Sequence, residues 1–154
     1  MSRDSRLSDV LHVLLHMAEA GSPVTSEVLA RAMSTNPVVV RRLLAGLREQ
    51  GYVRSDKGHG GGWSLARSLS DITLADIHAA LGRPSLLAIG NRAASPQCLV
   101  EQAVNAALGQ ALGEAEALLR DRFGQITLAR LAADFHQRMA ARAGAFDPET
   151  AHDG

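Results

Sequence analysis

The chain has 154 residues, of which 46% are hydrophobic and only 3% aromatic. This length fits one domain, or a small domain with an assembly element, and a core made mostly of Ala, Leu and Val favours helices. No apolar run approaches the roughly 18 to 20 residues that a membrane span requires, so no membrane partner is expected.

The formal net charge is zero, but the charges are divided unevenly along the chain. Residues 1–67 carry nine basic and six acidic side chains, whereas residues 68–154 carry seven and ten. The first part therefore has an excess of three positive charges and the second part an excess of three negative charges. If the protein binds a polyanion, we expect the first part to bind it.

The N-terminal segment superficially resembles a signal peptide. However, Asp9, His12 and His16 interrupt its apolar stretch, and its apolar residues are periodic, which indicates a folded helix. The single cysteine, Cys98, rules out an intrachain disulfide framework and fits a reducing compartment. We expect a cytoplasmic protein.

Three helices are predicted before residue 51. The first ends at Gly21, the second has Thr25 or Ser26 as its N-cap, and the third runs from its N-cap Asn36 to Gln50. The predicted apolar face of the second helix comprises Val28, Leu29, Ala32 and Met33. The tight break between the second and third helices is typical of a helix-turn-helix.

The third helix has one apolar and one cationic side. Val40, Leu43, Leu44 and Leu47 are predicted to face inward. In a helix-turn-helix the second helix enters the DNA major groove with its N-terminal residues leading. We therefore expect DNA contacts from Ser34, Thr35, Asn36, Val38, Arg41, Arg42 and Arg48. The alternative interpretation of such a face is an ordinary solvated surface.

Residues 52–67 are predicted to form the wing that often follows a helix-turn-helix. "YVRS" and "WSLA" are two short strand candidates separated by a glycine-rich loop, in which Lys57, His59 and Gly60 are expected to reach the DNA backbone or minor groove. The loop lacks the Gly-Lys-Ser/Thr ending of a phosphate-binding loop, and no helix begins within it as dinucleotide binding requires. Trp63 is expected to pack the wing onto the core.

The predicted fold is mainly α with a small β-hairpin. Residues 1–82 form a winged helix-turn-helix domain, whose fourth helix follows Thr73, and residues 83–95 a loop. Residues 96–143 hold two further helices, and residues 144–154 are expected to be a disordered tail.

The first of these two C-terminal helices is predicted to begin with Ser95 as N-cap and to run to about Arg122, which is longer than so small a domain needs. Pairing with a second copy would bury its apolar stripe, so a homodimer is expected. The predicted interface comprises Val100, Val104, Ala107, Leu108, Ala111 and Leu118. The last helix is expected to pack back onto the domain through Leu128, Leu131, Ala132, Phe135 and Met139.

The wing and the following helix carry a specific pattern. "GHGGGWSLARSLSDITLADIHAAL" resembles the signature of the Rrf2 family of bacterial winged-helix regulators, a Gly-Gly-aromatic-x-Leu-Ala-Arg run followed by Ile-Thr-Leu-x-Asp-Ile and an Ala. The upstream residues 27–55 are similar to the family's helix-turn-helix, and the resemblance covers roughly residues 6–140. It implies a homodimer, joined through the long helix, that binds double-stranded DNA at a near-palindromic operator and acts mainly as a repressor.

The best-known members of that family sense through an iron–sulfur cluster held by three cysteines around the start of the dimer helix. This chain offers Cys98 alone, so the three-cysteine cluster is not possible in one chain. The chain looks more like the cluster-free branch, and no cofactor is expected.

Two interpretations of Cys98 remain open. A free cysteine is often a small buried hydrophobic residue. Alternatively, with Ser95 as N-cap, Cys98 falls at the third helical position, where backbone N–H groups lower a thiol pKa and make it oxidisable. In that case Cys98 modulates operator binding in response to redox or thiol-reactive signals.

A metal site, an enzyme and a protein-association module are the alternatives to a DNA-binding protein. His12 and His16 could form half of a metal site, but no further ligand pattern completes it, so a solvated pair and no metal site are expected. The sequence contains no nucleophile–base pair that would indicate an enzyme, so no catalytic residue is expected. The alternative function is a winged-helix module for protein–protein association without specific DNA binding, which the zero net charge favours.

Overall fold

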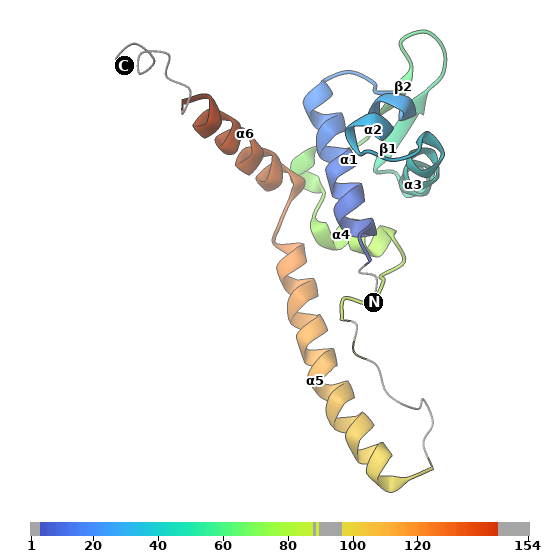
Figure 1. The fold of residues 1–154 in the computed structure, drawn as a ribbon, viewed down its shortest axis with the longest axis vertical. Coiled ribbons are helices and arrows are strands. Elements are labelled where there is room, and N and C mark those ends of the chain that lie inside the picture. The colour runs from blue at the N-terminus through green and yellow to red at the C-terminus, as the bar shows by residue number, and fades with distance from the viewer. Residues whose placement is uncertain (1–3, 88, 90–96, 145–154) are drawn as a thin grey trace, which may run out of the picture.

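A computed structural model of the chain describes residues 4–87, 89 and 97–144. Its elements in chain order are α1 (Arg6–Ala20), α2 (Ser26–Ala32), α3 (Pro37–Glu49), β1 (Val53–Asp56), β2 (Gly62–Leu65), the 3-10 turn η1 (Leu69–Asp71), α4 (Leu74–Ala80), α5 (Leu99–Gly124) and α6 (Leu128–Gly144) (Figure 1). The predicted fold class, a mainly helical winged helix-turn-helix with a long C-terminal helix, is confirmed. Among the described residues, no helix is both long and apolar enough to cross a membrane.

The second helix begins where it was predicted to begin, but its buried face only partly matches the predicted one. Thr25 is its N-cap, and the Thr25 hydroxyl accepts a hydrogen bond from the Val28 N–H at 3.3 Å. The buried residues are Ser26, Leu29 and Ala30, whereas Val28 is exposed. These three residues have the i, i+3, i+4 spacing of one helical face. The prediction was right for Leu29 and for Met33, which packs against the core, and wrong for Val28 and Ala32, because the polar Ser26 interrupts the apolar pattern that defines this face.

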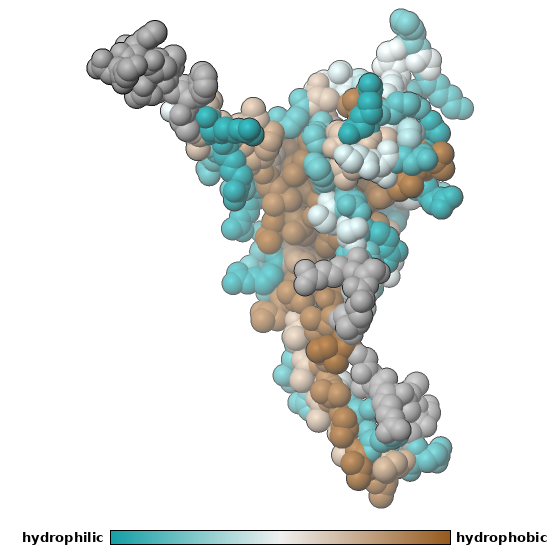
Figure 2. All heavy atoms as spheres, in the orientation of Figure 1, coloured by the Kyte–Doolittle hydropathy of each residue, from teal (hydrophilic) through white to brown (hydrophobic). Residues whose placement is uncertain are grey.

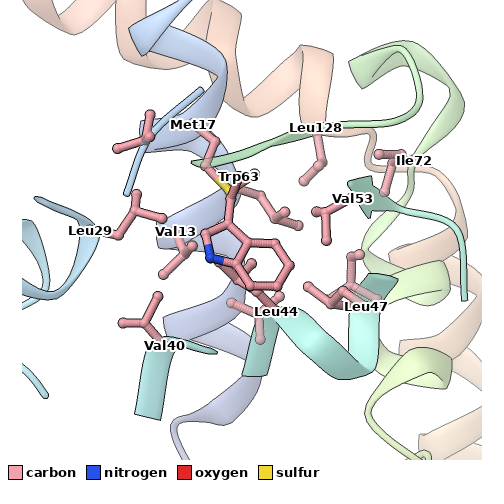
Figure 3. Packing of buried hydrophobic residues seen from close by; sticks show 14 of the residues in the cluster. Val13, Met17, Leu29, Val40, Leu44, Leu47, Val53, Trp63, Ile72 and Leu128 are labelled. Carbon is pink, nitrogen blue, oxygen red and sulfur yellow. The ribbon is translucent and has the colours of Figure 1, made fainter. Parts of the chain in front are cut away.

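One hydrophobic core joins the N-terminal helices to the hairpin and to the start of α6. Figure 3 shows side chains from these elements converging around Trp63. The fully buried side chains include Val10, Val13 and Leu14 of α1, Leu29 of α2, Val40, Leu44 and Leu47 of α3, and Ile77 and Leu128. Leu43, predicted to face inward, is half-buried against this core.

The hairpin is attached to the domain through its second strand. The Val24 N–H donates to the Trp63 carbonyl at 2.9 Å, and the Trp63 N–H donates to the Val24 carbonyl at 2.8 Å. The adjacent Gly62 has a φ of +149°, and a Cβ atom there would lie 2.7 Å from the Val24 oxygen. Only glycine fits this approach, which fixes where the wing leaves the domain.

Trp63 packs the wing onto the core, as predicted. Its ring is 9% exposed, and its indole Nε1–H donates to the Ser26 hydroxyl at 2.9 Å. This bond explains why a serine is buried in α2, since a buried indole N–H needs an acceptor.

The fourth helix returns the chain to the core. Thr73 and Asp76 form a reciprocal capping box, in which the Asp76 N–H donates to the Thr73 hydroxyl and the Thr73 N–H donates to the Asp76 carboxylate. Just before this cap, the Ile72 carbonyl accepts from the Leu128 N–H at 2.9 Å. The start of α6 is therefore joined to the start of α4, although α5 lies between them in sequence.

The two C-terminal helices are less enclosed than the rest. α5 projects away from the winged domain (Figure 1), and only the first part of α6 packs back, through the buried Leu128 and Ala132. Phe135 and Met139 are exposed, so the predicted packing of α6 holds for its first two turns and is wrong beyond them. In the predicted loop, residues 83–87 form no helix or strand, while residues 88 and 90–95 lie outside the described residues. Ser95, Pro96 and residues 145–154 of the predicted tail also lie outside them, whereas Gly144, predicted to begin the tail, ends α6 instead.

Replacing Ser26 with alanine is predicted to destabilise the domain by about 1–3 kcal/mol, because it leaves the buried Trp63 N–H without an acceptor. Urea unfolding at one protein concentration measures the change. In a Trp63→Phe background, which has no N–H to satisfy, Ser26→Ala should cost much less. An equal cost in both backgrounds would contradict the role given to this hydrogen bond.

Candidate nucleic-acid interface

The turn between α2 and α3 is built by local hydrogen bonds. Ser34 has a left-handed φ of +52°, and the Thr35 N–H donates to the Ala30 carbonyl at 2.9 Å. The Asn36 side-chain oxygen accepts from the Val38 N–H at 2.8 Å, which caps α3 at the predicted residue, and Pro37 occupies its first turn. Ser34, Thr35 and Asn36 are all exposed beside the start of α3.

The predicted sides of α3 are confirmed. Val40, Leu44 and Leu47 are buried, while Arg41 and Arg42 are exposed on the other side. Val38, at the leading end, is 53% exposed. The first half of α3 therefore presents two guanidinium groups and an apolar side chain outward.

Arg41 has a partner that the sequence did not indicate. Its Nη2 lies 2.6 Å from Oε1 of Glu27, in the first turn of α2, and both side chains are exposed. The backbone N–H of Glu27 itself, and then the Arg41 guanidinium, lower the pKa of the Glu27 carboxyl. Arg41 is thus paired with a carboxylate in the free protein. Spacing along one helix cannot reveal this pair, because it joins two helices.

Arg48 lies apart from the leading end of α3. It is seven residues beyond Arg41, which corresponds to about 10 Å along the helix axis. Its Nη1 donates to the Ser55 hydroxyl of β1 at 3.0 Å, and its guanidinium carbon lies 5.7 Å from the centre of the Trp63 ring. Arg48 therefore joins α3 to the base of the hairpin.

The wing is an antiparallel hairpin with an exposed tip. The register pairs Val53 with Leu65 and Asp56 with Gly62, so the tip comprises residues 57–61. Gly58 and Gly60 there have φ values of +93° and +77°, which glycine tolerates best. Lys57, His59 and Gly60 are exposed, and neither the Lys57 nor the His59 side chain has a polar partner within the described part of the chain.

The hairpin carries one more cation that was not in the predicted set. Arg54, on β1, is exposed, and its Nε donates to the Ser64 hydroxyl of β2 at 3.2 Å. Figure 1 places α2, α3 and the hairpin on the side of the domain away from α6. The structure thus brings the predicted turn, helix and wing residues onto one side.

Cys98 lies one turn earlier than predicted. It is the N-cap of α5 and not the third helical residue, and its thiol is exposed in this chain. Hydrogen bonds from the backbone N–H groups of Glu101, and then of Val100, lower the pKa of the Cys98 thiol. The interpretation of Cys98 as a buried residue is therefore wrong for the single chain, and its reactivity stays a prediction.

The predicted dimer stripe of α5 is not covered by any other described part of the chain. α5 is described throughout, and none of its residues is buried. Val100 and Leu118 are 70% and 63% exposed, and Val104, Ala107, Leu108 and Ala111 are exposed as well. Figure 2 shows hydrophobic residues along α5 below the winged domain.

The donor set of one chain does not fit an iron–sulfur cluster. Such clusters are held mainly by cysteine thiolates, and Cys98 is the only cysteine. Within the described ranges, no three His, Cys, Asp or Glu side chains are grouped so that they could hold a metal ion.

Iodoacetamide is predicted to alkylate Cys98 at lower pH values than it alkylates an ordinary thiol. The reason is that a lowered pKa leaves more of the reactive thiolate at pH 7. The measurement is the alkylation rate between pH 5 and 10. A Gln110→Cys substitution in a Cys98→Ser background supplies the control, an exposed thiol in the interior of the same helix. Identical pH midpoints for the two thiols would contradict the prediction.

Comparison with known proteins agrees with this geometry. The family model Rrf2, described as iron-dependent transcriptional regulators, matches residues 3–134. The HTH-type transcriptional regulator YwnA of Bacillus subtilis is 30% identical over 70% of this chain and 79% of its own length. A crystal structure of a transcriptional regulator from Lactobacillus plantarum superposes with a TM-score of 0.71 at 27% identity, covering 87% of this chain and 91% of that one. The IscR protein of T. potens shares the fold, with a TM-score of 0.66 at 20% identity over 87% of this chain and 88% of its own. The chain therefore belongs to the Rrf2 family and is a DNA-binding transcriptional regulator, not an enzyme.

Proposed function

We propose that the protein is a homodimeric repressor that binds a near-palindromic operator, with α3 and the wing of each copy on one half-site. The observation that carries the proposal is the exposed, cationic first half of α3, which a buried opposite side holds in place. A regulator of this kind works on cytoplasmic DNA.

Each exposed group has a distinct role in this proposal. Arg41 and Arg42 contact base edges or phosphates in the major groove, and Val38 makes apolar contacts at the leading end. Ser34, Thr35 and Asn36 face the DNA backbone at the start of the helix. Arg48 contributes positive charge while it holds the hairpin, which presents Lys57, His59 and Gly60 to phosphates or the minor groove.

DNA has to compete with Glu27 for Arg41. An exposed ion pair between flexible side chains contributes little, because water and salt screen it. A bidentate contact from arginine to guanine gives about 1–3 kcal/mol of discrimination against a wrong base. Arg41 therefore exchanges Glu27 for DNA, and Glu27 disfavours binding where no suitable base is offered.

Dimerisation is assigned to α5. Its exposed stripe, from Val100 to Leu118, is the kind of apolar surface that association buries. Two copies paired along it would place two α3 helices on one duplex, as a near-palindromic site requires.

Cys98 is the proposed point of control. An exposed thiol with a lowered pKa, at the start of the pairing helix, is open to oxidation or to electrophiles. A Cys98→Ser protein whose operator binding still responds to peroxide as the wild type does would remove this role.

Arg41→Ala is predicted to reduce the preference for the operator over random DNA by about 1–3 kcal/mol, because a base contact is lost. Lys57→Ala is predicted to weaken binding to both DNAs alike and to reduce the slope of log affinity against log salt by about one for each lysine lost. Titrations of both DNAs at two or more salt concentrations measure these effects.

Equal losses on operator and random DNA for both variants would contradict the two roles. Binding that does not weaken as salt rises would favour the alternative, a winged-helix module used for protein association.

Leu108→Glu is predicted to convert the dimer into monomers, because pairing would bury a carboxylate in each copy at a cost of several kcal/mol. Ala106→Glu places the same charge on the far side of α5 and should leave the dimer intact. Light scattering after size exclusion gives the mass of each variant. A monomeric wild type, or a dimer that survives Leu108→Glu, would contradict this assignment.

A further inference from the structure

His12 and His16 lie one turn apart on α1, and their imidazoles converge. The two Nε2 atoms are 3.0 Å apart, the ring centres are 4.7 Å apart, and the ring planes are inclined by 32°. Both side chains are exposed. The sequence spacing predicted a solvated pair without a metal ion, but spacing cannot show that the same nitrogen of both rings meets at 3.0 Å.

This separation matches two neighbouring ligands of one metal ion. Imidazole nitrogens bind divalent transition metals at about 2.0–2.1 Å, so two nitrogens 3.0 Å apart subtend about 94° at a shared ion. That angle is close to the 90° of octahedral or square-planar coordination. Tetrahedral coordination would need a separation of about 3.3 Å. Because affinity for first-row divalent ions is high at Ni²⁺ and Cu²⁺, these two ions are the ones to test.

The surroundings of His16 favour its neutral, metal-binding form. His12 and His16 line a pocket of about 210 Å³ together with Leu15, Glu19 and Phe135. Partial burial, and then the neighbouring His12, lower the pKa of His16. A neutral imidazole offers the nitrogen lone pair that a metal ion requires.

We propose that His12 and His16 bind one divalent transition-metal ion through their Nε2 atoms. This proposed metal site does not depend on whether the protein binds DNA. Among the described residues no third donor is grouped with the pair, so water fills the remaining coordination positions.

A bound dication would also act on the contact between α1 and α6. Glu19 lines the same pocket, and its Oε1 lies 2.8 Å from Nε2 of His136 on α6. A bound dication attracts this carboxylate from a distance, without binding it, and so weakens its pairing with His136. Removing His136 should leave metal binding intact or strengthen it, and this sets the pair apart from histidines that bind metals non-specifically.

The test is calorimetric titration of the full-length protein, without a polyhistidine tag, with Ni²⁺ at pH 7.5, and with Mg²⁺ as a negative control. One Ni²⁺ ion per chain is expected. His12→Gln or His16→Gln should weaken binding by roughly 10²- to 10⁴-fold, because each removes the chelate effect of the pair. His136→Gln, which alters an exposed histidine beside the same pocket, should bind at least as tightly as the wild type.

A second measurement uses the wild-type chain alone. With one equivalent of Cu²⁺, electron paramagnetic resonance should show hyperfine splitting from two equatorial nitrogens. If Ni²⁺ does not bind, if His12→Gln and His16→Gln bind it as the wild type does, or if the Cu²⁺ spectrum shows fewer than two nitrogens, the two rings only share a hydrogen bond and the proposal fails.

Discussion

The burial of one side of α3 decides where the other side points. Val40, Leu44 and Leu47 fill the core between α1 and the hairpin, so α3 cannot rotate about its axis without exposing them. Because successive helical residues are 100° apart, this packing turns Arg41 and Arg42 outward. The Asn36 cap fixes the end of the helix from which they are presented. The position of the wing depends on the same core, because Trp63 is anchored in it.

Much of this arrangement could be predicted because its signals are local. The Asn36 cap, the glycine-rich tip of the wing and the start of the fourth helix after Thr73 each involve residues a few positions apart, and all are found where the pattern placed them. The face of α2 was predicted correctly for Leu29 and Met33 but not for Val28 and Ala32, which are exposed. Its buried Ser26 is explained only by Trp63, 37 residues later, and no local pattern records that hydrogen bond.

The residues of the candidate site also divide into those that a local sequence pattern predicts and those whose contacts join separate elements. The exposure of Arg41 and Arg42 follows from the periodicity of α3, whereas the ion pair of Arg41 with Glu27 and the bond of Arg48 to Ser55 join separate elements. Cys98 was placed too far into its helix because the expected cap, Ser95, was chosen by residue type alone. The structure gives the cap to Cys98 itself, and there the backbone N–H groups act on the thiol directly.

The central claim is that the leading end of α3 enters the major groove. It is tested most directly by a DNA-cleaving reagent attached to that end of the helix. Val38→Cys in a Cys98→Ser background gives one thiol, to which a chelated iron that cuts nearby DNA can be attached. On the operator, the cuts should fall in two clusters centred about one helical turn apart, one for each half-site. Scattered cuts, or cutting no stronger than from the same reagent attached at position 110 of α5, would contradict the account.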